Sequence, residues 1–243
     1  DVVDKAFERY KQIQLNEGED YATFHTAKET LQERLKSLRD ELDRYLGKQY
    51  GKDADHKGGK EFDAWKKSHQ PFHWFAEYYG ILGKRGGFDV IIGNPPYVDY
   101  SENSGAYRLM NYETLPSGNL YAYVMERSRN IANEACYLGL IVPMSITSIR
   151  EFFSLRSCIS KRFGQTWTTN HAIRPQSLFT GVAQRVSILL AHPASKKNLQ
   201  WGTRYLRLKA ELRTTFQNLD YAELNTAQKV DGISPKLGTR IEK

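Results

Sequence analysis

Asn94, Pro95, Pro96 and Tyr97 are the residues of this sequence whose types and spacing can do chemistry. The amide oxygen of Asn94 and the backbone carbonyl of Pro95 are neighbouring acceptors, which suit a planar amino group that donates two hydrogen bonds. Such a nitrogen is a poor nucleophile because its lone pair is delocalised, as in adenine. Two fixed acceptors can draw it toward tetrahedral geometry, so that the lone pair points at an electrophile. The ring of Tyr97 adds a stacking surface for a base.

An apolar strand precedes this turn. Residues 88–93 read Phe-Asp-Val-Ile-Ile-Gly, and the β-branched run from Val90 to Ile92 predicts a central strand that is covered on both faces. Proline ends the strand because it removes backbone donors and fixes φ. We therefore expect Asn94 and the Pro95 carbonyl at the carboxyl edge of a sheet, where open α/β sheets bind ligands.

The hydrophobic periodicity of the rest of the chain predicts alternating helices and strands. Before the turn we expect two antiparallel helices and a glycine-rich boundary; after it, a polar loop of the kind that carries function, then a helix that Asn119 caps. Two strands with a second helix between them follow, and a last strand forms a hairpin with the strand before it. This order is typical of a doubly wound sheet with right-handed crossovers. The predicted ranges are 2–14 and 22–46 for the first helices, 51–60 for the boundary, 98–117 for the loop, 139–143, 166–173 and 186–191 for the strands, and 145–163 for the second helix.

Charge and composition narrow the partners. The net charge is +7, and from Ser148 onward 16 Lys and Arg stand against 6 Asp and Glu. A basic excess favours a polyanion because phosphate contacts release condensed counterions, although on charge alone a generically basic surface is an equally good interpretation. No stretch approaches the roughly 18 apolar residues of a membrane helix, and no signal segment opens the chain, so we expect a soluble cytoplasmic protein without membrane contact. Cys136 and Cys158 lack metal-ligand spacing, so we expect core thiols and no metal site.

The turn and its neighbours resemble a known family. Residues 88–98, Phe-Asp-Val-Ile-Ile-Gly-Asn-Pro-Pro-Tyr-Val, resemble the catalytic motif of the adenine-N6 DNA methyltransferases, and are especially similar to the large type IIG restriction-modification enzymes. Pro-Phe-His-Trp-Phe at residues 71–75 is also similar to that group. Residues 119–126 resemble the helix start that borders the cofactor pocket, residues 139–145 the next strand, and residues 178–190 the later loop and strand. The segments keep the family's order, which supports the resemblance.

The resemblance implies a fold and a reaction. The fold would be α/β, namely the C-terminal half of a Rossmann-like S-adenosylmethionine-dependent methyltransferase sheet with an N-terminal helical insertion. The reaction would be methyl transfer from S-adenosylmethionine to the N6 amino group of an adenine flipped out of double-stranded DNA, in a prokaryotic restriction-modification or phage-defence enzyme. For Phe179, whose implied role is to stack on the target base, a position in the core at the entrance of a strand is an equally good interpretation. The implied site residues are Asn94, Pro95, Pro96 and Tyr97 for catalysis, Tyr97 and Phe179 for stacking on the target base, and Asn119 and Leu120 for the cofactor.

One part of the family pattern is missing. The family binds the methionine end of its cofactor on a Gly-containing loop after its first strand, and no strand, Gly loop and helix precede Phe88. The chain also begins at Asp1 without an initiator Met, so we expect a fragment of a longer protein that binds the cofactor poorly alone. We expect a helical insertion or linker at residues 1–70, the catalytic half at 71–192, and a basic extension toward a target-recognition region at 193–243. The sequence contains no Pro-Asp strand followed by Glu-x-Lys, so it gives no support for a nuclease activity.

Two other functions stay open. The same turn could hold a glutamine of a protein or an adenine of RNA, since related turns serve planar amides too. A non-catalytic nucleic-acid-binding or assembly module with a methyltransferase-like fold would account for the absent cofactor loop. The basic excess and the long insertions favour a DNA substrate.

Overall fold

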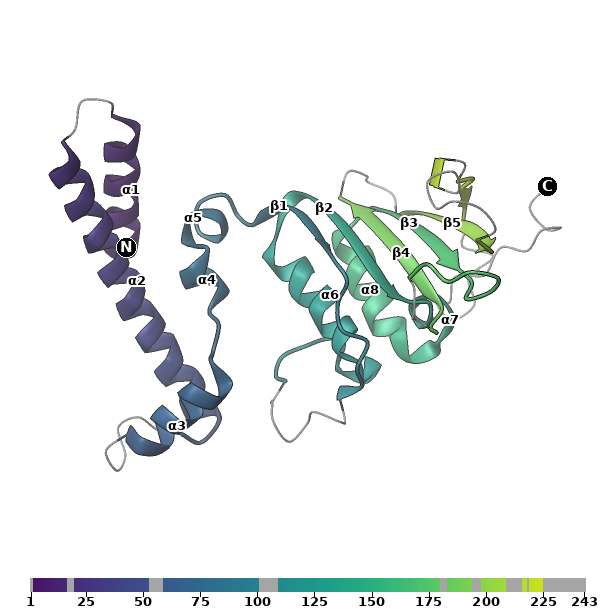
Figure 1. Ribbon diagram of the computed structural model, residues 1–243, viewed down its shortest axis with the longest axis horizontal. Helices are drawn as coiled ribbons and strands as arrows, with labels where there is room; N and C mark the ends of the chain where they lie inside the picture. The colour runs from purple at the N-terminus through teal and green to yellow at the C-terminus, as the bar shows by residue number, and fades with distance from the viewer. Residues whose placement is uncertain are drawn as a thin grey trace. The chain divides into compact units, whose positions relative to one another are not determined.

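The structure is a computed structural model that describes residues 2–16, 20–52, 59–100, 109–179, 183–193, 198–208, 216–217 and 219–224 (Figure 1). The chain divides into two compact units, Asp1–Arg85 and Gly86–Lys243. Each helix within these ranges is too short or too polar to span a lipid bilayer.

The first unit is helical. Its two longest helices lie side by side as an antiparallel pair joined by a short connection, as the periodicity predicted (Figure 1). A third helix and two single-turn helices follow. The five are α1 (Val2–Leu15), α2 (Tyr21–Gln49), α3 (Lys60–His69), α4 (Trp74–Glu77) and α5 (Tyr79–Leu82).

Polar contacts of Asp43 hold the first unit together. Asp43 lies in α2 and is 4% exposed. Its carboxylate pairs with Lys66 of α3 at 2.5 Å and with Nε2 of His73 at 2.7 Å. A buried carboxylate is stable only with such partners, so these contacts fix α3 and the start of α4 against α2.

The second unit is built on a mixed sheet of six strands in the order β1-β2-β4-β3-β5-β6. β1 is parallel to β2, β4 is antiparallel to both β2 and β3, β5 is parallel to β3, and β6 is antiparallel to β5. Four strands, β1, β2, β3 and β5, therefore end at one edge, termed the carboxyl edge below, and β4 begins there. The strands are β1 (Phe88–Gly93), β2 (Ala132–Pro143), β3 (Gln165–His171), β4 (Val186–His192), β5 (Leu199–Leu206) and β6 (Ala222–Glu223).

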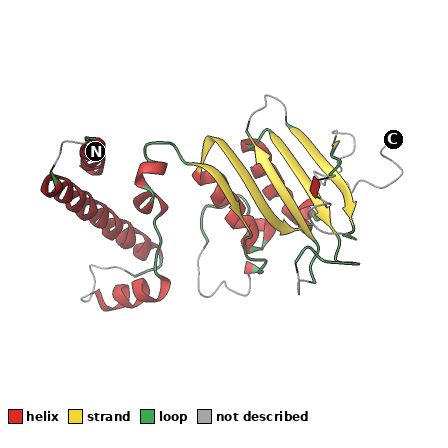
Figure 2. Cartoon of the chain, turned by 45° about the horizontal axis from the view of Figure 1, so that its top comes forward, coloured by secondary structure: helices red, strands yellow, loops and turns green. Residues whose placement is uncertain are grey.

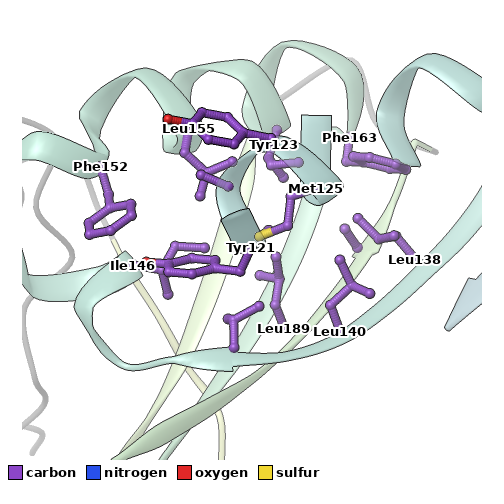
Figure 3. Close-up of a cluster of buried hydrophobic side chains, with 14 of the residues drawn as sticks. Tyr121, Tyr123, Met125, Leu138, Leu140, Ile146, Phe152, Leu155, Phe163 and Leu189 are labelled. Carbon is purple, nitrogen blue, oxygen red and sulfur yellow. The ribbon is translucent and has the colours of Figure 1, made fainter. Parts of the chain in front are cut away.

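Helices cover one face of this sheet. α6 and α8 lie against the same side of the strands in both views (Figures 1 and 2). Between them and the strands lies a core in which aromatic side chains of α6 and η4 meet aliphatic side chains of β2 and β4 (Figure 3). The helical elements are η3 (Leu115–Ser117), α6 (Leu120–Ile131), α7 (Ser145–Ser148), η4 (Arg150–Phe152) and α8 (Phe153–Arg162).

Several expectations are confirmed. The strand, helix, strand, helix, strand order is present, and β3 and β4 form the predicted antiparallel hairpin. Cys136 and Cys158 are buried free thiols. Burial raises the pKa of Cys158 to about 11, so this thiol stays protonated and unreactive.

The expectation that β1 is a central strand covered on both faces is wrong for the part of the chain that the structure describes. β1 is the first strand of the sheet order, and the side chains of Val90 and Ile92 are 58% and 79% exposed. Tyr137 of β2 and Leu190 of β4 continue this apolar surface at 57% and 46% exposure. We term these four side chains the open face; it borders a groove of about 600 Å³. In this part of the chain, helices cover one side of the sheet, so the doubly wound arrangement is absent.

Candidate active site

The Asn94 turn lies at the carboxyl edge, as predicted. β1 ends at Gly93, opposite Leu140 of β2, and the chain leaves the sheet at Asn94. Asn94 and Pro96 are exposed, Pro95 is buried, and Tyr97 is partly buried. The exposed amide of Asn94 is therefore held at the end of a strand, where a ligand at this edge can reach it.

The hydroxyl of Tyr97 lies between a side chain and the backbone of the next strand. Its oxygen lies 2.5 Å from Oδ1 of Asn94 and 3.0 Å from the carbonyl oxygen of Ile141, and these two acceptors compete for its single proton. The N–H of Met144 donates to the carbonyl of Arg185 at 3.0 Å. In an antiparallel pair, the backbone groups of every second residue point to the partner strand, so those of Met144 and Val142 face β4 and the carbonyl of Ile141 points away from it. The carbonyl of Ile141 therefore points toward the β1 side of β2. Because β1 ends at Gly93, opposite Leu140, the Tyr97 hydroxyl reaches this carbonyl where a further residue of β1 would otherwise pair with it.

Aromatic side chains support the ring of Tyr97. The ring meets Tyr121 of α6 edge to face, at 6.4 Å between centroids and 85° between planes. Tyr121 is 1% exposed and stacks on Phe152, which belongs to the same buried cluster, at 5.1 Å (Figure 3). It also shares a 2.9 Å hydrogen bond with Ser145. Burial raises the pKa of Tyr97, so its phenol keeps its proton at neutral pH and remains a donor.

Asn119 and Leu120 hold the segment that follows the turn. The side chain of Asn119 donates to Asp99 at 2.9 Å and accepts from the N–H of Tyr121 at 3.3 Å, which makes it the N-cap of α6. The N–H of Leu120 donates to the carbonyl of Val98 at 2.8 Å. These polar groups are thus engaged within the protein, and the cofactor role implied for the two residues stays a prediction.

Glu126 is a residue to which the sequence analysis assigned no role. It lies in α6 at 2% exposure, and its carboxylate accepts from the backbone N–H of Glu113 and from both donors of Thr114. These bonds anchor the end of the loop predicted at residues 98–117 to the helix. An acidic residue among the buried positions of a helix was the signal that could have found it. Residues 101–108 of that loop lie outside the described residues.

Phe179 lies in the connection between β3 and β4, at the same carboxyl edge as Asn94. It is partly exposed, and its carbonyl accepts from the hydroxyl of Ser177 at 2.6 Å. Residues 180–182, which belong to the same predicted segment, lie outside the described residues. Phe179 therefore lies in a connection at the carboxyl edge, and its stacking role stays a prediction.

Exposed arginines border the carboxyl edge. One follows β2, one follows β3, one precedes β4 and one follows β5, and these are Arg150, Arg174, Arg185 and Arg207. We term them the arginine rim. Across the described ranges, no carboxylate lies within ion-pair distance of any of the four. Their charge is therefore available to an anionic partner at the edge that carries Asn94.

The geometry suits an acceptor pair for an amino group, but it does not make a complete cofactor site. Within the described residues, no donor is bonded to the Pro95 carbonyl, and Asn94 Oδ1 keeps one lone pair beyond its bond to Tyr97. The same residues contain no cluster of three or more His, Cys, Asp or Glu side chains that could hold a metal ion. The described residues before β1 form helices, and among them no glycine loop joins a strand to a helix, which would be needed to receive a nucleoside cofactor. The described residues do not fit S-adenosylmethionine by themselves.

Comparisons with known proteins point in one direction. A family model described as Eco57I restriction-modification methylase matches residues 11–167. A protein of Methanocaldococcus jannaschii named "Putative type II restriction enzyme and methyltransferase RM.MjaORFECS2P" is 26% identical over 191 residues, which are 73% of this chain and 16% of that protein. The chain thus spans about a sixth of the length of this curated relative.

Two solved structures have a similar arrangement. A nuclease-deletion mutant of the Type ISP restriction-modification enzyme LlaGI, in complex with a DNA substrate mimic, aligns with 70% of this chain and 20% of its own, at 14% identity and a TM-score of 0.48. The DrdV–DNA complex aligns with 56% of this chain and 17% of its own, at 13% identity and a TM-score of 0.43.

Proposed function

This chain belongs to the Eco57I restriction-modification methylase family, and we propose that its reaction is methyl transfer from S-adenosylmethionine to the N6 amino group of adenine in double-stranded DNA. The observation that carries the proposal is the acceptor pair of Asn94 and Pro95 at the carboxyl edge. Adenine N6 has two hydrogens, and each acceptor takes one. Both bonds strengthen as the nitrogen becomes tetrahedral, which favours the transition state over the ground state.

Tyr97 and Phe179 are proposed to hold the target base. An adenine inside a duplex cannot reach the carboxyl edge, so it must leave the stack. The ring of Tyr97 is held through its hydroxyl and through the edge of Tyr121, which supports a stacking surface that is ordered before the base arrives. Phe179 lies at the same edge and would meet the base from its other side.

The arginine rim favours DNA over a protein substrate. A glutamine side chain would need the same two acceptors but no cationic border. Four exposed arginines without described carboxylate partners suit a phosphate backbone, since each phosphate contact releases a condensed counterion. A module that binds nucleic acid without catalysis would use the arginine rim, but it would have no use for the acceptor pair of Asn94 and Pro95.

The cofactor is proposed to bind where further polypeptide completes the sheet. S-adenosylmethionine supplies the electrophilic methyl group, and the described residues do not form its pocket. The open face is apolar, and β1 is the first strand in the order of the described sheet, so a further strand with its helix would be stable beside it. The relative from Methanocaldococcus jannaschii is long enough to include such a segment.

The test is a methylation map. DNA from cells that express the full-length protein is sequenced for N6-methyladenine, which also identifies the recognition site. We expect methylation at one sequence motif and its loss with Asn94→Ala, while Asn133→Ala, whose amide bonds Asp89 at the amino end of β1, keeps it. Unchanged adenine methylation in Asn94→Ala would reject the proposal. Methylation of RNA or of a glutamine instead would reject the DNA substrate.

A further inference from the structure

Three members of the arginine rim follow the strand order of the sheet, in one direction from the Asn94 turn. The turn lies at the end of β1, and β2, β4, β3 and β5 lie successively farther from it (Figure 1). Arg185 directly precedes β4, Arg174 lies shortly after the end of β3, and Arg207 directly follows β5. Neighbouring strands are about 4.8 Å apart, so these strand ends lie roughly 10, 14 and 19 Å along the edge from that of β1.

Backbone contacts fix this order. The carbonyl of Arg185 accepts from the N–H of Met144 at 3.0 Å, which ties the start of β4 to the end of β2. An isolated antiparallel bridge joins Gln176 to Leu208, and thereby joins the segments that follow β3 and β5. The positions of the three arginines along the edge are therefore set by the pairing of the strands.

The segment that carries the three arginines has no acidic residue to neutralise them. Residues 152–210 contain no Asp or Glu. The three side chains are exposed, and among the residues that the structure describes none of their guanidinium groups forms an ion pair or lies over an aromatic ring. Because the charges form a row, they suit an extended polyanion better than a single small anion.

We propose that Arg185, Arg174 and Arg207 form a track for the phosphates on one side of the flipped adenine, with Arg185 nearest to the target nucleotide and Arg207 farthest. This inference rests on the proposed function. The distance from the β4 end to the β5 end is about 10 Å, which corresponds to about three nucleotides at a rise of about 3.4 Å each. The turn that holds the adenine marks the other end of the row. Phosphates on the opposite side of the adenine would lie toward β1, where the rim has no member.

The test combines arginine variants with uncharged linkages in the DNA. A methylphosphonate, which lacks the charge of a phosphate, replaces each phosphate near the target adenine in turn, one linkage in each duplex. Dissociation constants are measured for the full-length wild-type protein, Arg185→Gln and Arg207→Gln. Where an arginine contacts a phosphate, the uncharged linkage should weaken binding by the wild type about 3- to 10-fold, and binding by the matching variant less than about 2-fold.

The positions of the coupled linkages decide the outcome. We expect Arg185→Gln and Arg207→Gln to lose sensitivity at different linkages on the same side of the adenine, with the linkage of Arg185 closer to it by about three nucleotides. Arg129→Gln, whose guanidinium pairs with Glu113, should keep the sensitivity of the wild type at every linkage. Coupling on opposite sides of the adenine, the reverse order, or no coupling for either arginine would overturn the track.

A methylation assay on the same duplexes separates this inference from the proposed function. Loss of adenine methylation in Asn94→Ala, together with a linkage map that lacks the expected order, rejects the track alone. Retention of adenine methylation in Asn94→Ala rejects the proposed function, and the track falls with it. The two failures are therefore distinguishable.

Discussion

The carboxylate of Glu126 binds Thr114 through both of that residue's donors. Oε2 accepts from the Thr114 backbone N–H at 2.9 Å and from its hydroxyl at 2.7 Å, while Oε1 accepts from the N–H of Glu113 at 3.0 Å. Thr114 is fully buried and Glu126 is 2% exposed. The helix that supports Tyr97 through Tyr121 therefore also anchors the end of the loop that follows the Asn94 turn.

Glu126→Gln should loosen this loop. The substitution replaces one acceptor by a donor that faces the donors of Glu113 or Thr114, so we expect a loss of about 1–3 kcal/mol in unfolding free energy. Hydrogen exchange should become faster at the amides of Glu113 and Thr114. Glu134→Gln, the same change on an exposed residue of β2, should stay within about 0.5 kcal/mol of the wild type. Equal stability of the two variants would contradict the anchoring role.

The sequence predicted which segments form helices and strands better than where they end. The strand expected at residues 139–143 is only the carboxyl part of β2, because pairing of Ala132 with Phe88 extends the strand through polar residues that have low strand propensity. The helix expected at residues 145–163 is broken at Ile149, whose backbone is extended. The guanidinium of Arg156 donates to the carbonyls of Ile146 and Ile149 and stabilises the break, a tertiary contact without a local signal.

β5 was not expected at all. Its interior contains Gly202, and its clearest contact is the stack of Trp201 on Trp167 of β3, at 4.8 Å and 9°. Such a pair depends on strand register, which periodicity alone does not reveal.

The position of the candidate site could be predicted from the sequence, but the hydrogen bonds that hold its residues in place could not. The two prolines correctly predicted that a strand ends directly before or at Asn94. The bonds of the Tyr97 hydroxyl and of Glu126 join residues from different elements, so they required the three-dimensional arrangement. The β-branched run of β1 indicated burial on both faces, which the described residues do not provide.

Removing two charges of the arginine rim should weaken the salt dependence of DNA binding. For Arg174→Gln combined with Arg185→Gln, we expect the negative slope of log K against log salt concentration to become shallower. Its magnitude should decrease by about 0.9 per lost phosphate contact, or about 1.8 in total. The measurement is a titration of a duplex with the full-length protein at several salt concentrations.

The control for the rim is Arg129→Gln. Arg129 lies near the end of α6, which runs away from the carboxyl edge, and its guanidinium pairs with Glu113 at 3.2 Å. This variant should leave the slope unchanged. The same slope in the rim variant and in the wild type would mean that phosphates bind elsewhere.

His171 should make the second unit less stable in mild acid. It is fully buried at the end of β3, its Nε2 lies 2.8 Å from the Thr169 hydroxyl, and burial lowers its pKa to about 4 from the ordinary 6.5. The unfolded chain therefore binds a proton more readily than the folded one, so the stabilisation is complete above about pH 7 and is lost as pH falls from about 6.5 to about 4. We expect about 2 kcal/mol less unfolding free energy at pH 5 than at pH 7 from this residue.

Urea titrations at the two pH values check this expectation. His171→Leu removes the titrating group, so the difference between pH 7 and pH 5 should shrink by about 2 kcal/mol. His25→Leu changes an exposed histidine of α2 and should keep the full difference. An undiminished difference in His171→Leu would assign the acid sensitivity to other groups.

The open face should matter only where further polypeptide covers it. Val90→Thr combined with Ile92→Thr keeps β-branched side chains on β1 and removes apolar surface that is largely exposed in this chain. In the 243-residue chain we expect a change of less than about 1 kcal/mol. In the full-length protein we expect a loss of about 2–4 kcal/mol and weaker S-adenosylmethionine binding, because the same side chains would be buried there. Ile91→Val, on the helix-covered face of β1, should cost about 0.5–1.5 kcal/mol in both proteins. A small effect of the double variant in both proteins would contradict the proposal that further polypeptide covers the open face.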